Sequence, residues 1–452
     1  MTTWTDLPAM AKIEVVVDGD DVPNVRDLFL LGVYDEYVTP WLAEATRAAE
    51  LLMKGARPPK IATVVLPQAA LRPFARGTVW QCLDPERCSP VQPSDRHTIF
   101  PGRRQIDRAA MRAIAAELGW DDDDIIQQIG EGGIETRSEC QLSTVLSWHH
   151  TGFHRQLAAA RHVIDGEIQD EWVSEPLASL PFVPCRVLPR NVVMQQRTRK
   201  RADGTIEQYQ KPRISTDCSD GAEESVNGGV PPHERDIELP SVQKFGRAVA
   251  MVDAAGTTPA DEAAGEAPTR AEMYIVDATA AYRFCPLNIT QLYTQVFAYW
   301  TIGDEGIKVG FCVDRRMMFG GSYAPNRFER ISRLIGAYIQ LQQRRFDERQ
   351  PPPPCAQRWQ RMRRGRQLAG LLELHPAEAE PRSLQVFIDD WMGSSLNDTV
   401  TLEPALAALD IAPSATTNVG GIPSAPSSRT RAHACIAILG LRTAGLEAAE
   451  DK

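Results

Sequence analysis

The sequence predicts an α+β protein in which short strands pack against helices. Apolar segments rich in strand-forming residues end at acidic residues, as in MYIVD at 273–277 and LQVFIDD at 384–390. The segment at 324–346 instead repeats its apolar residues at helical spacing. At 452 residues the chain is longer than one hydrophobic core usually serves, so we expect at least two structural units.

The composition is that of a folded protein, with 43% hydrophobic and 24% charged residues. No apolar run reaches the ~18 residues of a membrane helix, and the start, MTTWTDLPAMAK, lacks the basic and apolar segments of a secretion signal. The nine cysteines are odd in number and scattered, which favours reduced thiols. We therefore expect an intracellular protein of the cytoplasm or nucleus, without a membrane partner.

The net charge of −10 argues against a uniformly basic surface for nucleic acid, but not against a local one. Two segments are dense in arginine: RTRKR at 197–201 and RWQRMRRGR at 358–366. Each is either a solvated loop or a contact with phosphate, and both interpretations stay open.

Residues 1–147 are predicted to be a mainly helical region, and no motif in them indicates a chemistry. A helix is expected over 104–119, because apolar residues recur there at helical spacing and Gly119 suits a left-handed cap. Four aspartates follow at 121–124. They precede a short apolar pattern, so we interpret them as capping or solvated residues rather than as a ligand cluster.

The candidate chemistry lies in residues 148–452, which two segments of biased composition interrupt near 253–272 and 347–382. The first is rich in Ala, Gly, Thr, Pro and acidic residues, and the second contains a four-proline run. We expect both segments to be insertions.

Acidic residues occur where strands are expected to end. Asp277 should lie at the C-terminal end of a buried strand, where a reactive group is both rigid and open to a ligand. Tyr282 follows after a turn of small residues. We expect Asp389 and Asp390 to form the two-residue connection of a hairpin, where adjacent side chains can approach one ligand. Taken alone, such a pair is an ordinary turn.

A long helix is expected after the glycine-rich segment FGGSYAP at 319–325. Ser322 suits its N-cap and Pro325 its first turn. Three arginines on its polar face, Arg327, Arg330 and Arg333, either meet solvent or contact phosphate. The apolar stripe comprises Phe328, Ile331, Leu334, Ile335, Tyr338 and Ile339.

In this order, the three segments resemble motifs A, B and C of reverse transcriptases. Asp277 and Tyr282 match D-x4-[YF], and AAYRFCPL after them resembles the usual DAYFQIPL. The segment 319–328 matches FG-x3-AP-x2-F, and 387–390 matches [YF]-x-DD. The shared order and internal spacing make the resemblance specific.

Further segments extend the resemblance to about residues 150–445. Arg213 and Asp217 match a fingers motif in which an aspartate follows an arginine by four residues. The segment 197–201 resembles the tip of a fingers hairpin that turns at ADGT, and CIAILGL at 435–441 resembles the primer-grip hairpin.

The resemblance implies a right-hand polymerase fold of fingers and palm, with an antiparallel palm sheet backed by helices. HVIDGEIQDEWVSEP at 162–176 and SVNG at 225–228 look most like retroelements of the DIRS type, which integrate with a tyrosine recombinase. The chain is therefore expected to be a retroelement-derived reverse transcriptase, an RNA-directed DNA polymerase. Its partners would be an RNA or DNA template with a primer, and deoxynucleoside triphosphates. The oligomeric state is left open.

The resemblance also implies a site for two metal ions. Two Mg²⁺ ions, or alternatively Mn²⁺, would activate the primer 3′-oxygen and stabilise the leaving pyrophosphate. Asp277 and Asp389 would bridge the ions. The Ala278 carbonyl would be a further ligand, and Asp390 would be the more peripheral carboxylate.

For nucleotide binding, the resemblance implies roles for Arg213, Asp217, Tyr282, Phe319 and Gly320. Arg213 would lie over the triphosphate, because a permanently charged fork suits phosphate oxygens. Tyr282 would pack under the sugar and exclude a 2′-hydroxyl, which selects deoxynucleotides. Phe319 and Gly320 would contact the incoming nucleotide and the templating base.

The chain also departs from the family's pattern. Met318 stands where a proline usually precedes Phe-Gly, and LDIAPSATTN at 409–418 lacks the lysine expected after the catalytic hairpin. A decayed or domesticated copy that binds nucleic acid or a partner without polymerising is therefore the alternative. A template-independent or RNA-copying polymerase would share the palm and the metal ions, and Tyr282 argues only against RNA synthesis.

Overall fold

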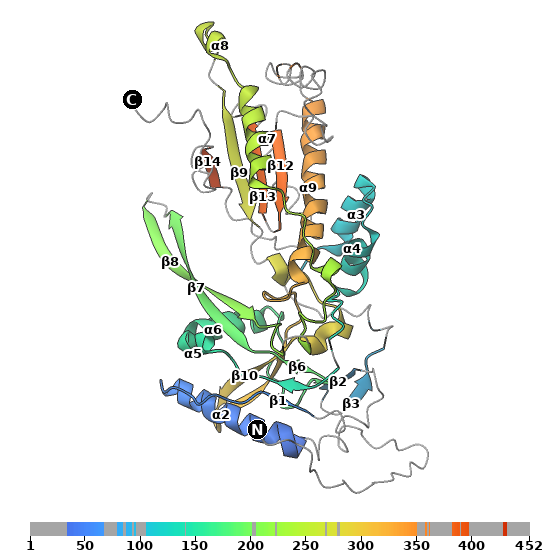
Figure 1. Cartoon of the computed structure of the whole chain (residues 1–452), viewed down its shortest axis with the longest axis vertical. Helices are drawn as coiled ribbons and strands as arrows, with labels where there is room; N and C mark the ends of the chain where they lie inside the picture. The colour runs from blue at the N-terminus through green and yellow to red at the C-terminus, as the bar shows by residue number, and fades with distance from the viewer. Residues whose placement is uncertain are drawn as a thin grey trace.

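The computed structural model describes residues 34–66, 79–84, 87–92, 95, 105–140, 142–200, 205–221, 224–266, 269–277, 281–349, 358, 361, 382–388, 390–396 and 428–431. These residues form a mixed α+β fold, which confirms the predicted α+β class, whereas the polymerase arrangement of fingers and palm stays a prediction. In Figure 1 a mixed sheet lies in the lower part of the molecule, a long hairpin projects beside it, and a second sheet lies above. No helix within these ranges is long and apolar enough to cross a bilayer.

Residues on both sides of position 147 build the lower, five-stranded sheet. Its strand pairs β4–β6 and β6–β10 are parallel, whereas β1–β4 and β10–β11 are antiparallel. Helix α2 (Thr39–Met53) packs against β11, where Trp41 stacks on Phe311 with ring centroids 6.1 Å apart. The described part of the first 147 residues therefore shares one hydrophobic core with later segments. The strands are β1 (Val64–Val65), β4 (Val145–Leu146), β6 (Arg186–Val187), β10 (Val296–Gly303) and β11 (Gly306–Val313).

A long antiparallel hairpin consists of β7 (Arg190–Lys200) and β8 (Ile206–Thr216), paired in unbroken register. It confirms the hairpin predicted around 197–201, and of the predicted turn ADGT at 202–205 only Thr205 lies within the described residues. In Figure 1 the hairpin rises from the lower sheet to one side of the upper sheet, and Ile206 near its tip is 75% exposed. Its outer half is therefore open to solvent.

The upper, four-stranded sheet is antiparallel throughout, in the order β12–β13–β9–β14. Helices α7 (Val242–Ala254) and α9 (Ala324–Glu348) pack against it. The strands are β9 (Ala271–Asp277), β12 (Arg382–Phe387), β13 (Asp390–Leu396) and β14 (Ser428–Arg431). A small hydrophobic cluster joins α7 to the sheet: Phe245, Val249, Val252, Ala255, Ala271, Met273 and Leu396.

Helix α9 buries most of the apolar stripe predicted for it, and only Tyr338 in that stripe is half-buried. At Gly336 a Cβ would lie 2.6 Å from the Val386 side chain, so glycine lets the helix approach β12 closely. The Trp391 Nε1–H donates to the Ser332 carbonyl oxygen at 3.1 Å. Contacts of this kind hold the β12–β13 hairpin on the helix.

Two predictions about the polar groups of this helix need correction. Ser322 is not the N-cap, because α9 begins at Ala324 and the Ser322 backbone N–H donates to Asn227 Oδ1 at 2.7 Å. Arg327 and Arg330 are not a solvated face, because acidic side chains from other segments hold them: Arg327 is buried against Glu234, and Arg330 binds Asp122 and Asp124. Arg333 is exposed, as the solvated interpretation predicts, and pairs with Glu329 of the same helix and with the exposed Glu238.

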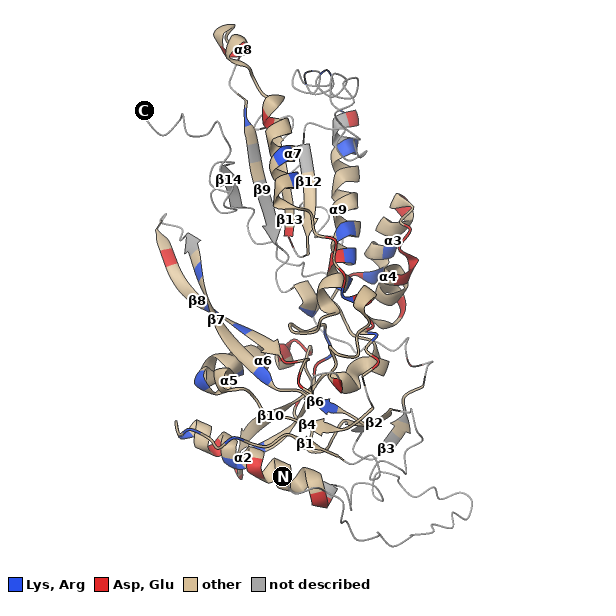
Figure 2. Cartoon of the chain, in the orientation of Figure 1, with Lys and Arg blue, Asp and Glu red and all other residues tan. Residues whose placement is uncertain are grey.

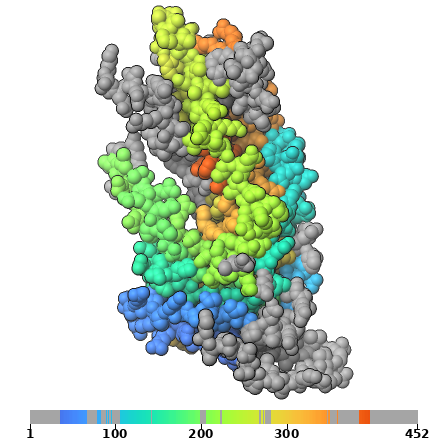
Figure 3. Space-filling view, in the orientation of Figure 1, coloured from blue at the N-terminus to red at the C-terminus, as the bar shows by residue number. Residues whose placement is uncertain are grey.

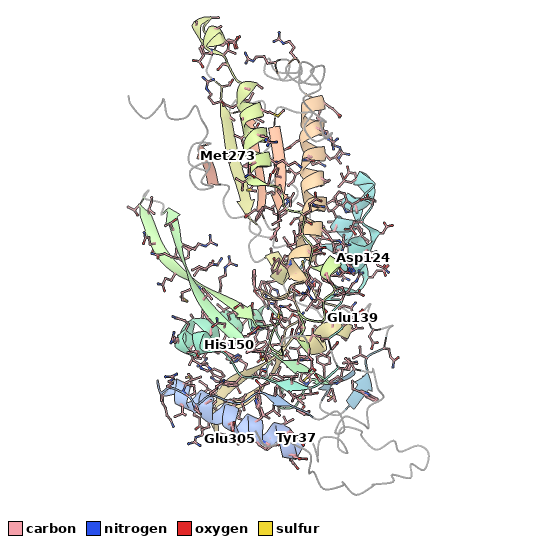
Figure 4. All side chains as sticks on the ribbon, viewed as in Figure 1. Tyr37, Asp124, Glu139, His150, Met273 and Glu305 are labelled. Atoms are coloured by element: carbon pink, nitrogen blue, oxygen red, sulfur yellow. The ribbon has the colours of Figure 1, made fainter. Side chains whose placement is uncertain are left out.

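Helix α3 (Arg108–Leu118) confirms the helix predicted there, and Gly119 ends it in a left-handed conformation with φ +59°. Asp122 accepts from the Ile125 backbone N–H at 3.2 Å and caps α4 (Asp123–Gln127). The capping prediction for the aspartate run is therefore confirmed. Asp124 also reaches α9, which it faces in Figure 4, through a 2.8 Å contact with Arg330.

The segment predicted as an insertion near 253–272 contains α8 (Pro259–Ala263), which begins with a capping box between Thr258 and Asp261. Figure 1 shows α8 at the upper tip of the molecule. Of the segment 347–382, only 347–349, 358, 361 and 382 are described. The remaining elements are η1 (Tyr34–Val38), β2 (Trp80–Asp84), β3 (Arg87–Pro90), η4 (Gln128–Gly132), α5 (Thr151–Arg155), α6 (Leu157–Gln169), β5 (Phe182–Val183), η6 (Pro232–Glu234), η7 (Ala281–Phe284) and η8 (Ile289–Thr294).

Candidate functional site

Two of the predicted acidic residues meet on the four-stranded sheet. Asp277 is the last residue of β9, as predicted, and its register partner on β13 is Asp390. Residues directly opposite each other in an antiparallel pair have Cβ atoms about 4.5–5.5 Å apart on the same face of the sheet. The fold therefore brings the two positions to one end of one face.

The hairpin turn lies one residue earlier than predicted. Phe387 pairs with Asp390, so the two-residue connection is Ile388–Asp389 rather than Asp389–Asp390. Ile388 has φ +54°, as the first position of a type I′ hairpin turn requires. Pairing of β13 with β9 and packing of the hairpin on α9 set this register, and a primed two-residue turn matches the twist of the strands. Asp390 is thus the first residue of β13, and its side chain is half-buried.

Part of the predicted metal site lies outside the described residues. Asp389 and Ala278 are both among those left out, and for Asp277 only the backbone is described. Within the described ranges, no three His, Cys, Asp or Glu side chains are grouped so that they could hold a metal ion. The predicted Mg²⁺ ligands therefore stay a prediction.

The predicted nucleotide-binding residues do come together, around Phe319. The Tyr282 ring packs against Phe319, with centroids 4.8 Å apart, and meets Phe328 edge-on at 5.7 Å. The Arg213 guanidinium carbon lies 5.5 Å from the centroid of the Phe319 ring. Tyr282 is 8% exposed and Phe319 is half-buried. The Phe319 ring is therefore supported by its packing on Tyr282, and the long cationic side chain of Arg213 lies near its face.

Gly320 allows the backbone beside Phe319 to reach β8. Its φ is +120°, and a Cβ there would lie 1.9 Å from the Thr216 carbonyl oxygen. The Thr216 backbone N–H donates to the Phe319 carbonyl oxygen at 2.8 Å. Any other residue would be strained in this conformation and would push the two segments apart.

Asp217 lies directly after β8, where it links the hairpin to the five-stranded sheet. Its Oδ2 is 2.9 Å from His150 Nε2, and its Oδ1 accepts from the Ser219 backbone N–H at 3.0 Å. Its own N–H donates to the Pro189 carbonyl oxygen. In Figure 4, His150 lies at the foot of the hairpin. Asp217 is therefore near Arg213 along the chain, but its carboxylate is directed to a histidine.

Asn227 joins the two segments that carry these residues, and no role was predicted for it. Its Nδ2 donates to Ser219 Oγ and to the Gly320 carbonyl oxygen, each at 2.9 Å, and its Oδ1 accepts from the Ser322 N–H. One amide therefore fixes the backbone on both sides of Gly321. The only signal in the sequence was the SVNG segment that contains it.

A cluster of buried charged side chains lies next to the residues around Phe319. Arg190 at the start of β7 lies 2.6 Å from Asp314, and Arg283, next to Tyr282, lies 2.8 Å from the same carboxylate. Glu167 completes the cluster, 2.9 Å from Arg283 Nε, and burial raises the pKa of its carboxyl group. The cluster ties the base of the hairpin to the segment of Tyr282. No sequence pattern predicts this cluster, because its members are far apart along the chain, from α6 to the end of β11.

In Figure 3 the β7–β8 hairpin, in green, stands across an open recess from the central segments of the chain. The residues around Phe319 lie at the inner end of the hairpin, where β8 meets the segment before α9. The arrangement can place a cation and an aromatic ring beside a ligand in that recess.

The chain matches no protein-family model. No curated protein is significantly similar to it.

Proposed function

We propose that this chain is a retroelement-type reverse transcriptase that synthesises DNA on a template by two-metal nucleotidyl transfer. The observation that carries the proposal is the register pairing of Asp277 with Asp390. Two aspartates that are far apart in the sequence become neighbours at the end of an antiparallel sheet. In this proposal the β7–β8 hairpin belongs to the fingers and the four-stranded sheet is the palm.

The donor set fits Mg²⁺. Carboxylates held on the same face of a sheet repel each other, and a divalent cation offsets that repulsion. Mg²⁺ prefers oxygen ligands and is commonly held by a few carboxylates together with substrate phosphates. Asp277, Asp389 and Asp390, with the Ala278 carbonyl, would hold two such ions. The ions would supply activation of the primer 3′-oxygen and stabilisation of the leaving pyrophosphate.

The residues around Phe319 would bind the incoming nucleotide. Arg213 would contact the triphosphate, since its guanidinium has no acidic partner within the described residues and one weak hydrogen bond to Gln195 at 3.3 Å. Tyr282, supported by two aromatic rings, would close the space beneath the sugar to a 2′-hydroxyl. Gly320 would let the backbone approach the nucleotide, and Asp217 would orient the hairpin's inner end through His150.

A second candidate is a chain that binds nucleic acid through the hairpin without polymerising. The hairpin favours it, because Arg197 is exposed there and Lys211 and Arg213 are half-buried, and such cations would attract phosphate whether or not metal is bound. The absence of the lysine expected after the catalytic hairpin also favours this candidate. A general acid typically contributes about 10²–10⁴-fold to the rate, so a polymerase without it would be slower.

Primer extension on an RNA template with Mg²⁺ and deoxynucleotides separates the two candidates. Wild type should extend the primer, and Asp277→Asn or Asp389→Asn should lower the rate by about 10²-fold or more, because metal stabilisation of the transition state amounts to several kcal/mol. Asp304→Asn, in the exposed turn between β10 and β11, is the matched control. Extension unchanged in all variants would refute the metal site, and template binding without extension in wild type would support the second candidate.

The sugar-selection role of Tyr282 has its own test. Tyr282→Ala should raise incorporation of ribonucleotides relative to deoxynucleotides, whereas Tyr282→Phe keeps the ring and should keep the selectivity. A Tyr282→Ala enzyme that extends the primer and still rejects ribonucleotides would contradict the assignment.

A further inference from the structure

A cavity of about 950 Å³ lies beside the foot of the hairpin, where His150 and Pro189 line it. One wall is the segment after α2, including Arg57, Lys60 and Ile61. The other wall runs from Trp148 through α5, including His154 and Arg155. Its volume lies at the upper end of the ~300–1,000 Å³ that small-molecule sites occupy, and exceeds what a single phosphate ion needs.

The electrostatic character of the cavity is basic. Arg57, Lys60 and Arg155 line it, and none of the three has an acidic partner in the described part of the chain. Asp220 is the one carboxylate among the described lining residues, and it already accepts a hydrogen bond from Ser147 Oγ. In Figure 2 the ribbon is blue, the colour of Lys and Arg, at the end of α2 and on α5, below the hairpin. Three unpaired cations around one concave site attract an anion.

Polar groups within the wall also lack partners. Trp148 is 7% exposed, and its Nε1–H has no hydrogen-bond acceptor among the described residues. The buried Nε2 of His154 is likewise without a partner there. Both nitrogens are themselves buried within the wall and not exposed in the cavity, so binding there would depend on the three cations.

We infer that this cavity is a second, separate binding site for nucleotide units, either free or as part of a single strand. Phosphates would be held by Arg57, Lys60 and Arg155, and the apolar lining residues Pro58, Pro59 and Pro189 would receive a base or sugar. His150 connects the cavity to the first site, because it lines the cavity and its Nε2 binds Asp217. The inference concerns binding alone and does not depend on polymerase activity.

The test measures binding by the full chain without divalent metal and without extension. Fluorescence anisotropy would follow a labelled ten-nucleotide single-stranded RNA and, in a separate arm, a labelled nucleoside triphosphate. The triple variant Arg57→Gln/Lys60→Gln/Arg155→Gln removes the three cations. The control Arg47→Gln/Lys244→Gln/Arg247→Gln removes two arginines and one lysine from exposed helix positions that do not line the cavity.

We expect the cavity variant to bind at least about tenfold more weakly than the control at moderate salt. For the single strand, the slope of log affinity against log salt concentration should be less steep by about 2 in the cavity variant. The reason is that each of the three lost phosphate contacts contributes about 0.7 to that slope. If the cavity variant loses affinity for the RNA alone, the site binds a single strand. If it loses affinity for the triphosphate alone, the site binds a free nucleotide.

Equal binding of both ligands by the cavity and control variants would overturn the inference. Photocrosslinking with RNA that contains 4-thiouridine tests the position of the bound RNA independently. Crosslinks within 147–155 or 52–63 support the site, and crosslinks confined to the β7–β8 hairpin refute it. Arg213→Gln, at the first site, tests the proposed function instead, so failure of one proposal does not imply failure of the other.

Discussion

Asp277 and Asp390 are direct register partners on β9 and β13, so the two positions lie on the same face at one end of the four-stranded sheet. Carboxylates at such neighbouring positions repel each other when no cation offsets their charge. The proposed metal site therefore predicts that stability depends on divalent metal.

Without Mg²⁺, Asp277→Asn should unfold at a higher temperature than wild type, because one of the repelling charges is gone. Saturating Mg²⁺ should stabilise wild type by about 2.7 kcal/mol at a concentration 100 times its Kd, and should have little effect on the variant. Differential scanning calorimetry with and without Mg²⁺ measures both effects. Asp304→Asn is the control, and equal Mg²⁺ stabilisation of wild type and Asp277→Asn would contradict the site.

Gly320→Ala should disrupt the contact between β8 and the segment before α9. The added Cβ would lie 1.9 Å from the Thr216 carbonyl oxygen, in a backbone conformation with φ +120°. We expect a loss of about 1–3 kcal/mol in the free energy of unfolding. Gly303→Ala, where no atom lies within 4 Å of the added Cβ, should change it far less. Equal denaturant midpoints for the two variants would show that this contact does not hold the segment.

Asn227→Ala should loosen the backbone around Gly320. The change removes three hydrogen bonds of 2.7–2.9 Å to Ser219, Gly320 and Ser322, and we expect it to cost about 1–3 kcal/mol. Amide hydrogen exchange in the peptide 317–323 should become faster. Ser219→Ala removes only one of these bonds and serves as the milder control. Protection of that peptide unchanged by Asn227→Ala would contradict the role of Asn227.

Stability should fall in mild acid because of His149. The imidazole is fully buried, its Nε2 lies 2.7 Å from the Ala298 carbonyl oxygen, and its Nδ1 accepts from the Arg190 N–H. Burial lowers the pKa of His149 to about 3. Between that value and its ordinary pKa of about 6.5, the unfolded chain binds more protons than the folded chain, so stability is lost as pH falls through this window.

From pH 7 to pH 5 the contribution of His149 amounts to a loss of about 2 kcal/mol in the free energy of unfolding. Urea titrations at both pH values measure it. His149→Gln should reduce the difference between the two pH values, whereas His162→Gln, at an exposed position of α6, should not. A wild-type chain equally stable at pH 7 and pH 5 would contradict the prediction.

Local patterns in the sequence predicted several elements correctly. The apolar stripe of α9, the end of α3 at Gly119 and the cap at Asp122 all depend on residues within a few positions of each other. The placement of Asp277 at a strand end is of the same kind. Such features follow from side-chain spacing and backbone preference, which a short window of sequence contains.

Features that depend on distant partners were predicted wrongly or not at all. Arg330 was expected to meet solvent or phosphate, yet it binds Asp122 and Asp124 from another segment. The hairpin turn was placed one residue too late, because pairing with β9 and packing on α9 set its register. Asn227 and the ion cluster around Asp314 likewise join segments that the sequence keeps apart.

The sequence by itself therefore determined which residues could form strands, helices and caps, and which acidic and aromatic residues were candidates for chemistry. The tertiary structure decided which candidates became neighbours: Asp277 beside Asp390, and Tyr282 and Arg213 beside Phe319. The physical reason is that spacing along the chain specifies the local face of an element. Burial and hydrogen bonding between distant segments then select which faces meet.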